Sequence, residues 1–283
     1  MVPRPPPRPI RACLFDMDGL LINTEDLITT SINTILHKYD KPPIPGHIRA
    51  EIQGLHLTEA SEIILRYSGL PLTFEEYQVQ LAEQHARLFP TAHPLPGVVT
   101  LLQDLTRSEQ VELALATSSG RGKFELKTGH LQGMFSQHFP EECRVLGDDP
   151  RLGSGKGKPE PDIYLLALDA VNAKSSRQGQ APILPEQCLV LEDAIAGVES
   201  GRRAGMQVLW CPHADILRSC QGIEEHVLMG TAGGVESSHD SLVDVARSEE
   251  DVTSSHSRWS EDRWARMLST LEHFPYDDYG IKV

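Results

Sequence analysis

Short apolar runs typical of buried strands recur along the chain, with helical patterns between most of them. The runs are Ile10–Phe15, Val111–Ala116, Arg144–Leu146, Cys188–Leu191 and Met206–Trp210. Apolar residues at helical spacing fill Val98–Leu105 and Pro161–Val171. Strands that alternate with helices form a parallel sheet with helices on both faces, so the pattern predicts a three-layer α/β fold. Ligands bind such sheets beyond the carboxyl ends of the strands.

A different pattern occupies residues 26–93, where no strand-like run is found. Two prolines and a glycine within Thr91–Gly97 mark a turn at its end. We therefore predict a smaller all-helical domain at 26–93, inserted into a sheet domain made of residues 10–25 and 94–283. The apolar residues that recur at helical spacing are Leu27, Ile28, Ile32, Ile35, Leu36, Ile63, Ile64, Leu81 and Leu88.

The N-terminus and the C-terminal region carry weaker patterns. Residues 1–9 alternate Pro and Arg, which predicts a short disordered leader, since so many prolines cannot form the helix of a transit peptide. Residues 230–260 are rich in Ser, Gly, Asp, Glu and His, and we expect a disordered insertion there. Ala265–Leu271 is expected to form a final short helix, followed by an aromatic docking segment at Phe274–Tyr279.

Charge and cysteine content restrict the class of partner. A formal charge of −14 disfavours nucleic acid, which requires clustered Lys and Arg. No apolar run approaches the roughly 18 residues of a membrane helix. The five cysteines are widely spread without a C-x-x-C pair, which fits reduced thiols in the cytosol or nucleus and argues against a zinc site. We therefore expect a cytoplasmic or nuclear monomer whose partner is a small molecule.

Two carboxylates follow the first predicted strand. Asp16 and Asp18 are one residue apart, and Gly19 allows the backbone to turn there. The acids then converge above the sheet, a setting that suits Mg²⁺, which takes a few carboxylates together with phosphate oxygens. Asp16 could attack phosphorus to form an aspartyl-phosphate, while Asp18 could protonate the leaving group and later accept a proton from water. An exposed surface turn is the alternative for this short segment alone.

Hydroxyl groups and a lysine follow at two further positions. Thr117 ends the second strand and Ser118 comes next. Hydroxyls and free N–H groups there can bind phosphate, although helix capping is the commoner use of such residues. Lys158 lies in a glycine-rich loop that also holds Lys156, and it could neutralise both a phosphate and the Asp16 carboxylate. A solvated loop lysine is the alternative.

A second acid pair ends the fourth strand and precedes a predicted helix. Glu192 and Asp193 could serve only as helix caps, but with Asp16 and Asp18 they would complete a metal site. The order along the chain is acid pair, hydroxyl, lysine, acid pair, and each group lies at a strand end or a helix start on one edge of one sheet. Jointly, these groups favour a magnesium-dependent phosphatase that acts on a small phosphomonoester.

The same residues resemble the motifs of a known family. Leu14–Leu21, Leu115–Ser118, Lys158–Asp162 and Leu191–Val198 are similar to the four motifs of the haloacid dehalogenase-like hydrolases. The resemblance runs from about Ile10 to Trp210. It implies a Rossmann-like core with a helical cap inserted after the first motif, Mg²⁺ as cofactor, and phosphoryl transfer. The roles it implies are nucleophile and metal ligand for Asp16, acid/base and backbone metal ligand for Asp18, phosphate binding for Thr117, Ser118 and Lys158, and metal binding for Glu192 and Asp193.

The sequence departs from this family pattern at two places. Relatives often place a basic residue directly after the cap glycine, whereas this chain has Gly54, Leu55 and His56, which we expect to help choose the substrate. Asn23 stands where many relatives carry Asp, in the linker to the cap, with little expected effect on the chemistry. The substrate is expected to resemble a nucleotide or sugar phosphate. The alternatives are a polyol-phosphate phosphatase, a phosphosugar mutase, or a retired binding module, which the intact motifs disfavour.

Overall fold

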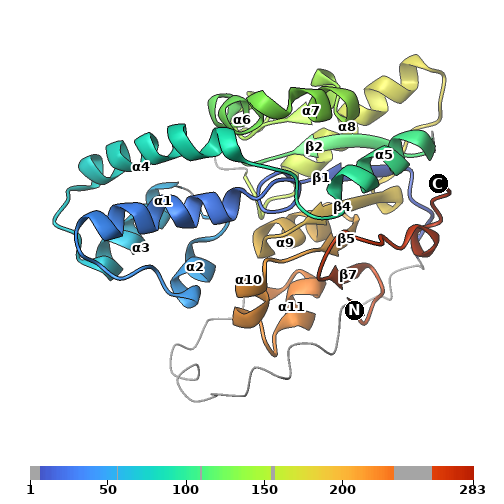
Figure 1. Cartoon of the computed structure of the whole chain (residues 1–283). Helices are drawn as coiled ribbons and strands as arrows, with labels where there is room; N and C mark the ends of the chain where they lie inside the picture. The colour runs from blue at the N-terminus through green and yellow to red at the C-terminus, as the bar shows by residue number, and fades with distance from the viewer. Residues whose placement is uncertain (1–6, 56, 109, 154–156, 233–256) are drawn as a thin grey trace.

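One mixed sheet forms the centre of the protein (Figure 1), whose computed structural model describes residues 7–55, 57–108, 110–153, 157–232 and 257–283. Its seven described strands lie in the order β3-β2-β1-β4-β5-β7-β6. Neighbouring strands are parallel except β6 and β7, which are antiparallel. The strands are β1 (Ala12–Phe15), β2 (Glu112–Ala116), β3 (Arg144–Val145), β4 (Cys188–Glu192), β5 (Gln207–Trp210), β6 (Ser257–Trp259) and β7 (Ala265–Leu268).

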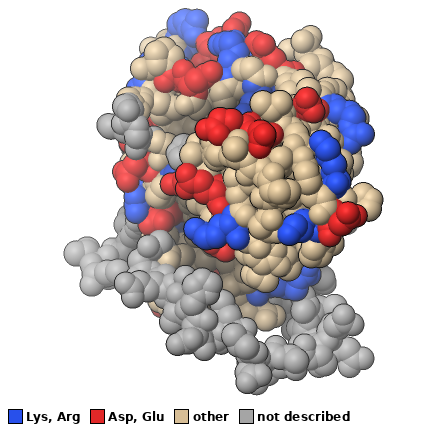
Figure 2. Space-filling model, turned by 90° about the vertical axis from the view of Figure 1, so that its left-hand side faces the viewer, with Lys and Arg blue, Asp and Glu red and all other residues tan. Residues whose placement is uncertain are grey.

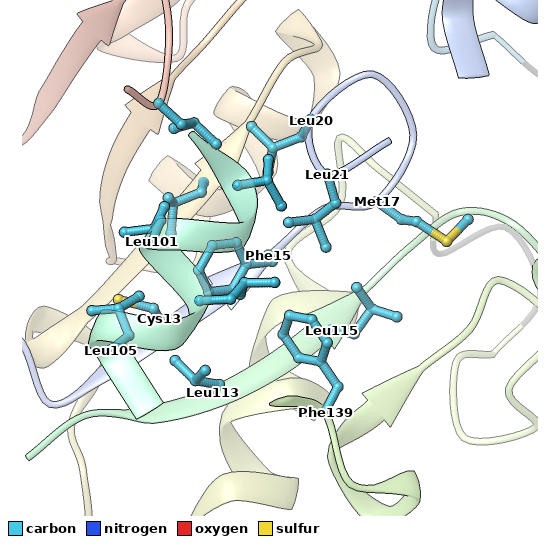
Figure 3. Packing of buried hydrophobic residues seen from close by; sticks show 14 of the residues in the cluster. Cys13, Phe15, Met17, Leu20, Leu21, Leu101, Leu105, Leu113, Leu115 and Phe139 are labelled. Carbon is cyan, nitrogen blue, oxygen red and sulfur yellow. The ribbon is translucent and has the colours of Figure 1, made fainter. Parts of the chain in front are cut away.

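Alternate residues of the central strands enter two separate apolar clusters, one on each face of the sheet. In β1, Cys13 and Phe15 belong to one cluster, and Ala12 and Leu14 to the other. Figure 3 shows Phe15 beside side chains of α5 and the phenylalanine that follows α7. Burial on both faces explains the uninterrupted apolar runs and confirms the predicted three-layer α/β fold. The helices are α5 (Val98–Ser108), α6 (Arg121–Thr128) and α7 (Gln132–His138) on the first face, and α8 (Asp162–Arg177), α9 (Ile195–Arg203), α10 (Ala214–Ser219) and α11 (Glu224–Met229) on the second.

A group of helices between β1 and α5 has an apolar cluster of its own. They are α1 (Thr24–Lys38), α2 (Gly46–Ile52), α3 (Leu57–Ser68) and α4 (Phe74–Leu88), and they lie beside the sheet in Figure 1. Their cluster includes Ile32 and Ile35 of α1 and Tyr77 and Leu81 of α4. This helical region agrees with the expected insertion, whose boundaries at 26–93 remain a prediction.

The two linkers to these helices are bound to each other. Ile22 forms isolated bridges with both Asp18 and Pro94. The backbone N–H of Asn23 donates to the carbonyl of His93 at 3.1 Å, and the N–H of His93 donates to Oδ1 of Asn23 at 2.8 Å. The chain therefore leaves and re-enters the sheet region at one point, close to the end of β1.

The C-terminal region corrects two expectations. Ala265–Leu268 is strand β7 and not a helix, because it pairs with β5 on one side and β6 on the other. Ser257–Trp259, inside the segment 230–260 expected to be disordered, forms β6. Residues 233–256 of that segment, and residues 1–6 of the predicted leader, lie outside the described residues. The docking segment is confirmed: Phe274 and Tyr279 are buried in the first apolar cluster.

Charged residues of both signs lie on the described surface. On the face that Figure 2 shows, Lys and Arg side chains are interspersed with Asp and Glu over much of the described surface. On this face the described residues therefore form no continuous basic patch (Figure 2). Within the part of the chain that the structure describes, no helix has the length and apolarity needed to cross a membrane.

Candidate active site

Asp16 lies where β1 ends, and the sheet register places it beside the second acid pair. Phe15 is in register with Leu191 of β4, and the Asp16 N–H donates to the Leu191 carbonyl at 3.0 Å. The next residue along β4 is Glu192, followed by Asp193. The carboxylates of Asp16, Glu192 and Asp193 are buried, and one oxygen from each lies within 4.8 Å of the others. Among the described residues, this cluster could hold a metal ion.

Lys158 is enclosed by two of these carboxylates. Its Nζ lies 2.5 Å from Oδ1 of Asp16 and 2.6 Å from Oε1 of Glu192, and it donates to the Ala116 carbonyl at 3.1 Å. The ammonium also lies 5.1 Å from the ring centroid of Tyr164, within the range of a cation–π contact. Lys158 is therefore not a solvated loop lysine, and its charge acts directly on Asp16.

Glu192 is held by several donors at once. Oε1 accepts the hydroxyl of Tyr164 at 2.5 Å as well as Lys158, and Oε2 accepts the backbone N–H groups of Asp193 and Ala194 at 3.1 and 3.3 Å. Gly197 in the first turn of α9 leaves room for the carboxylate, since a Cβ there would lie 1.9 Å from it. The helix start thus supplies both donors and space for a buried acid.

The charges in the cluster do not balance. Burial raises the pKa of Asp16 to about 8, with Lys158 opposing this rise and Glu192 and Asp18 adding to it. Burial, together with Asp16 and Glu192, raises the pKa of Asp193 well above its usual range. Three buried carboxylates face one lysine, so the site has an excess of negative charge. A divalent cation would relieve that excess, and all-oxygen ligands suit Mg²⁺.

Asp18 lies in a separate group of polar contacts. Oδ1 accepts from Nζ of Lys127 at 2.7 Å and from Oγ1 of Thr24 at 2.6 Å, while Oδ2 accepts from Oγ of Ser119 at 2.8 Å. Burial alone would raise the pKa of Asp18, but Lys127 and these hydrogen bonds outweigh it and lower the pKa. The two aspartates of the motif therefore have opposite electrostatic settings. Pairs of acids with opposed pKa shifts are typical of sites that divide two chemical roles.

Gly19 makes the close approach of these groups possible. Its φ is +77°, a left-handed conformation that side chains other than glycine rarely adopt. A Cβ at this position would lie 2.2 Å from Oδ2 of Asp193 and 2.9 Å from Cγ of Glu25. The turn after β1 therefore requires glycine both for its backbone angle and for space at the acid cluster.

The residues that follow β2 present one buried and one exposed hydroxyl. Thr117 is fully buried, and its Oγ1 accepts the backbone N–H of Ser119 at 3.1 Å. Ser118 is exposed, and its backbone packs against Gly147, where a Cβ would lie 2.1 Å from the Ser118 carbonyl oxygen. Both residues lie at the same sheet edge as Asp16, because β1 and β2 are neighbours in register. Their role in phosphate binding remains a prediction.

Comparison with known proteins agrees with this geometry. A family model described as haloacid dehalogenase-like hydrolase matches residues 10–205, well over half of the chain. The chain belongs to the haloacid dehalogenase-like hydrolases. The expected family is thereby confirmed, and the Rossmann-like fold is confirmed by the sheet and by solved structures. A candidate β-phosphoglucomutase from Thermotoga maritima superposes with a TM-score of 0.56 at 26% identity, covering 80% of this chain and 100% of that one.

Curated relatives carry phosphatase names. A probable pseudouridine-5′-phosphatase from Saccharomyces cerevisiae is 39% identical over 209 residues, which are 74% of this chain and 85% of the relative. The (DL)-glycerol-3-phosphatase 1 of Arabidopsis thaliana, a mitochondrial protein, is 33% identical over 218 residues, 76% of this chain and 68% of the relative. These names agree with the phosphatase class that the motifs predict for this haloacid dehalogenase-like hydrolase.

The helical insertion reaches this hydrolase site through a residue that sequence reasoning missed. Nε2 of Gln53 donates to Oδ2 of Asp193 at 2.6 Å. The predicted specificity residue Gly54 lies near Asp193, since a Cβ there would be 3.6 Å from that of Ala194. Leu55 is 41% exposed. The third predicted residue, His56, lies outside the described residues.

Two further residues of the site were not predicted, Tyr164 and Lys127. Both occupy positions on amphipathic helices, where their spacing is that of ordinary core residues. The available signal was weak: a tyrosine and a lysine stand where the helical pattern calls for apolar side chains. Their hydrogen bonds to Glu192 and Asp18 become evident only in the folded chain.

Proposed function

We propose that this chain is a magnesium-dependent phosphatase that hydrolyses a small phosphomonoester through an aspartyl-phosphate on Asp16. The observation that carries the proposal is the contact of Nζ of Lys158 with Oδ1 of Asp16, beside the carboxylates of Glu192 and Asp193. A carboxylate nucleophile, a buried cation and a metal-binding acid cluster are what such an attack needs.

Magnesium fits the donor set. Asp16, Glu192 and Asp193 would hold it with carboxylate oxygens, and the backbone carbonyl of Asp18 is a further proposed ligand. Bound there, Mg²⁺ would neutralise the charge that the carboxylates and a substrate phosphate bring together.

The protein groups supply the rest of the proposed reaction. An oxygen of Asp16 attacks phosphorus, with Lys158 reducing the repulsion between the carboxylate and the phosphate. Thr117 and Ser118 bind phosphate oxygens with hydroxyl and N–H groups. Asp18 protonates the departing oxygen, and afterwards it accepts a proton from the water that hydrolyses the aspartyl-phosphate. Inorganic phosphate and the free alcohol are the products.

Pseudouridine 5′-phosphate is the first substrate we propose, because relatives at 36–39% identity are named as probable pseudouridine-5′-phosphatases. The cap, proposed as residues 26–93, would select it through the region of Gln53 to His56. A glycerol phosphate or another polyol or sugar phosphate is the second candidate, favoured by the glycerol-3-phosphatase relatives. A phosphosugar mutase on the same scaffold is a third, favoured by the structural neighbour.

A panel of phosphomonoesters assayed with Mg²⁺ tests the proposal, with Asp16→Asn as the matched inactive variant. We expect phosphate release by the wild type and at least about a 10³-fold loss in the variant. Equal rates for the two proteins would refute the phosphatase. Preference for a hexose or polyol phosphate would replace only the first substrate, and isomer formation without phosphate release would identify a mutase.

We also propose that the protein works as a monomer in a reducing compartment, the cytosol first. The five cysteines are free, and four of them are buried. Buried thiols without a disulfide partner fit such a compartment. Fractionation of cells, together with the molecular mass in solution, tests both statements.

A further inference from the structure

Lys127 is a buried lysine of α6 that the proposed reaction does not yet use. Its side chain is 5% exposed. Nζ lies 2.7 Å from Oδ1 of Asp18, 3.0 Å from Oγ of Ser119 and 4.8 Å from the ring centroid of Phe89. Removing an ammonium group from water is costly unless close partners replace the water. The close partners of Lys127 therefore explain why its ammonium group can be buried at this position.

The hydrogen bonds make the two oxygens of Asp18 unequal. Oδ1 faces Nζ of Lys127, and an ammonium group can only donate hydrogen bonds. Oδ1 also receives the hydroxyl of Thr24 at 2.6 Å, so it is occupied as an acceptor. Oδ2 faces the hydroxyl of Ser119, which can either donate or accept. Oδ2 is therefore the oxygen of Asp18 that can carry a proton without losing its partner.

Contacts on the far side of Lys127 hold its ammonium group in place. The Phe89 ring stacks on the His85 ring of α4, with centroids 4.3 Å apart and planes inclined by 15°. Nε2 of His130, just after α6, lies 2.5 Å from the carbonyl oxygen of Ala92. α6 is thus tied to the linker that returns from the helical insertion. Since a free lysine samples many rotamers, this enclosure is what gives Nζ a single position.

We propose that Lys127 is a positioning residue that orients Asp18, so that Oδ2 exchanges the proton during phosphoryl transfer. The inference rests on the proposed function, because proton transfer by Asp18 is part of that proposal. Lys127 itself touches no reacting atom. It acts by occupying Oδ1 and by fixing the plane of the carboxylate, which general acid catalysis needs because proton transfer depends on geometry.

The proton on Oδ2 of Asp18 takes part in both chemical steps. A P–O bond forms to Asp16 while the bond from phosphorus to the leaving oxygen breaks. The electron pair of the broken bond goes to that oxygen, which takes the proton from Oδ2 of Asp18. Water then attacks phosphorus, its proton goes to Oδ2, and the bond to Asp16 breaks with its electron pair returning to the carboxylate. An alkoxide leaves poorly without a proton, whereas p-nitrophenolate leaves readily.

This difference between leaving groups provides the test. The kcat/KM of the wild type and of Lys127→Met is measured for the best alkyl phosphate of the substrate panel and for p-nitrophenyl phosphate, with Mg²⁺. We expect Lys127→Met to lose at least about tenfold more on the alkyl ester than on the aryl ester, since general acid catalysis contributes roughly 10²–10⁴-fold. A loss of the same size on both esters, or no loss, would overturn the proposal.

Lys123→Met is the matched control, because it removes the same charge one turn earlier on α6 from an exposed position, where the lysine acts on Asp18 through its charge and not through a hydrogen bond. We expect it to leave the ratio of the two kcat/KM values unchanged. An equal change in this ratio for Lys123→Met would contradict the proposal. It would show that the loss of any positive charge on α6 has the effect, and not the loss of the hydrogen bond from Lys127 to Asp18. If Lys127→Met does not fold, the two kcat/KM values are measured for Lys127→Gln in its place, with the same expected outcome. A wild type that hydrolyses neither ester refutes the proposed function itself, which is a separate result.

Discussion

Asn23 and His93 form two hydrogen bonds that join the linkers between the sheet and the helical insertion. The Asn23 N–H donates to the His93 carbonyl, and the His93 N–H donates to Oδ1 of Asn23 at 2.8 Å. Asn23 is buried, so water cannot easily replace these bonds. The linkers meet within a few residues of Asp16 and Asp18, and their pairing therefore affects the position of the first motif.

Replacing Asn23 tests this pairing. Asn23→Ala leaves the His93 N–H without its acceptor, and we expect the free energy of unfolding to fall by about 1–2 kcal/mol. Asn23→Asp should lose less, because a carboxylate oxygen also accepts the bond. Urea unfolding of the three proteins measures the difference. An Asn23→Ala protein as stable as the wild type would show that the side-chain bond contributes nothing.

Loss of Lys158 should greatly reduce the activity. In Lys158→Met, Asp16 and Glu192 lose the ammonium group that lies within 2.6 Å of both, and their repulsion of a phosphate increases. We expect kcat/KM to fall by about 10²–10³-fold or more. Lys174→Met is the control, since Lys174 pairs with Glu112 at the start of β2, away from the acid cluster. A comparable loss in both variants would contradict a specific role for Lys158.

Asp193→Asn should change the magnesium requirement. The substitution removes one of three carboxylates that lie within 4.8 Å of one another, so a cation would bind with one ligand charge fewer. We expect the Mg²⁺ concentration for half-maximal activity to rise by about tenfold or more. Titration of activity with Mg²⁺ measures it, with Asp169→Asn on the exposed face of α8 as control. An unchanged Mg²⁺ midpoint would exclude Asp193 as a ligand.

Gly197→Ala should disturb Glu192 by direct overlap. The added Cβ would lie 1.9 Å from the buried carboxylate, so Glu192 or α9 must move. We expect a loss of about 1–3 kcal/mol in the free energy of unfolding, together with reduced activity. Gly133→Ala in α7 is the matched control, because a Cβ there meets nothing within 4 Å and alanine favours helices. Thermal unfolding should therefore separate the two variants clearly.

Protonation of His85 should lower the free energy of unfolding in mild acid. Burial, with Lys127 and Lys123 nearby, lowers the pKa of His85 from 6.5 to about 4. Between these values the unfolded chain binds the proton and the folded chain does not, so stability decreases as the pH falls through this window. The loss at pH 5 would be on the order of 2 kcal/mol. His85→Gln should flatten the unfolding free energy between pH 7.5 and 5, and His37→Gln, an exposed control on α1, should not.

Much of the sheet could be predicted because its central strands are buried on both faces. Such strands are continuous apolar runs, and polar residues stand out where they end. Phe15 and Leu191 illustrate this: each ends an apolar run, each precedes an acid, and parallel pairing sets them in register. The convergence of Asp16 with Glu192 and Asp193 was therefore predictable from order and spacing.

Short segments at the sheet edge could not be assigned in this way. Ala265–Leu268 is too short for its apolar pattern to distinguish a strand from a helix, and pairing with β5 and β6 decides the outcome. Ser257–Trp259 has a polar composition that predicted disorder, yet it pairs with β7. β7 receives its hydrogen bonds from β5, a strand distant in sequence, and β6 then pairs with β7 alone, so local propensity is a poor guide to either strand.

The sequence by itself determined the fold class, the family and the acids at the strand ends, because these follow from local patterns that a parallel sheet brings to one edge. Only the tertiary structure decided which helix side chains complete the site. Gln53, Lys127 and Tyr164 lie on or beside helices, where spacing shows that a face is buried but not what it meets. Their contacts with Asp193, Asp18 and Glu192 depend on how each helix packs against the sheet.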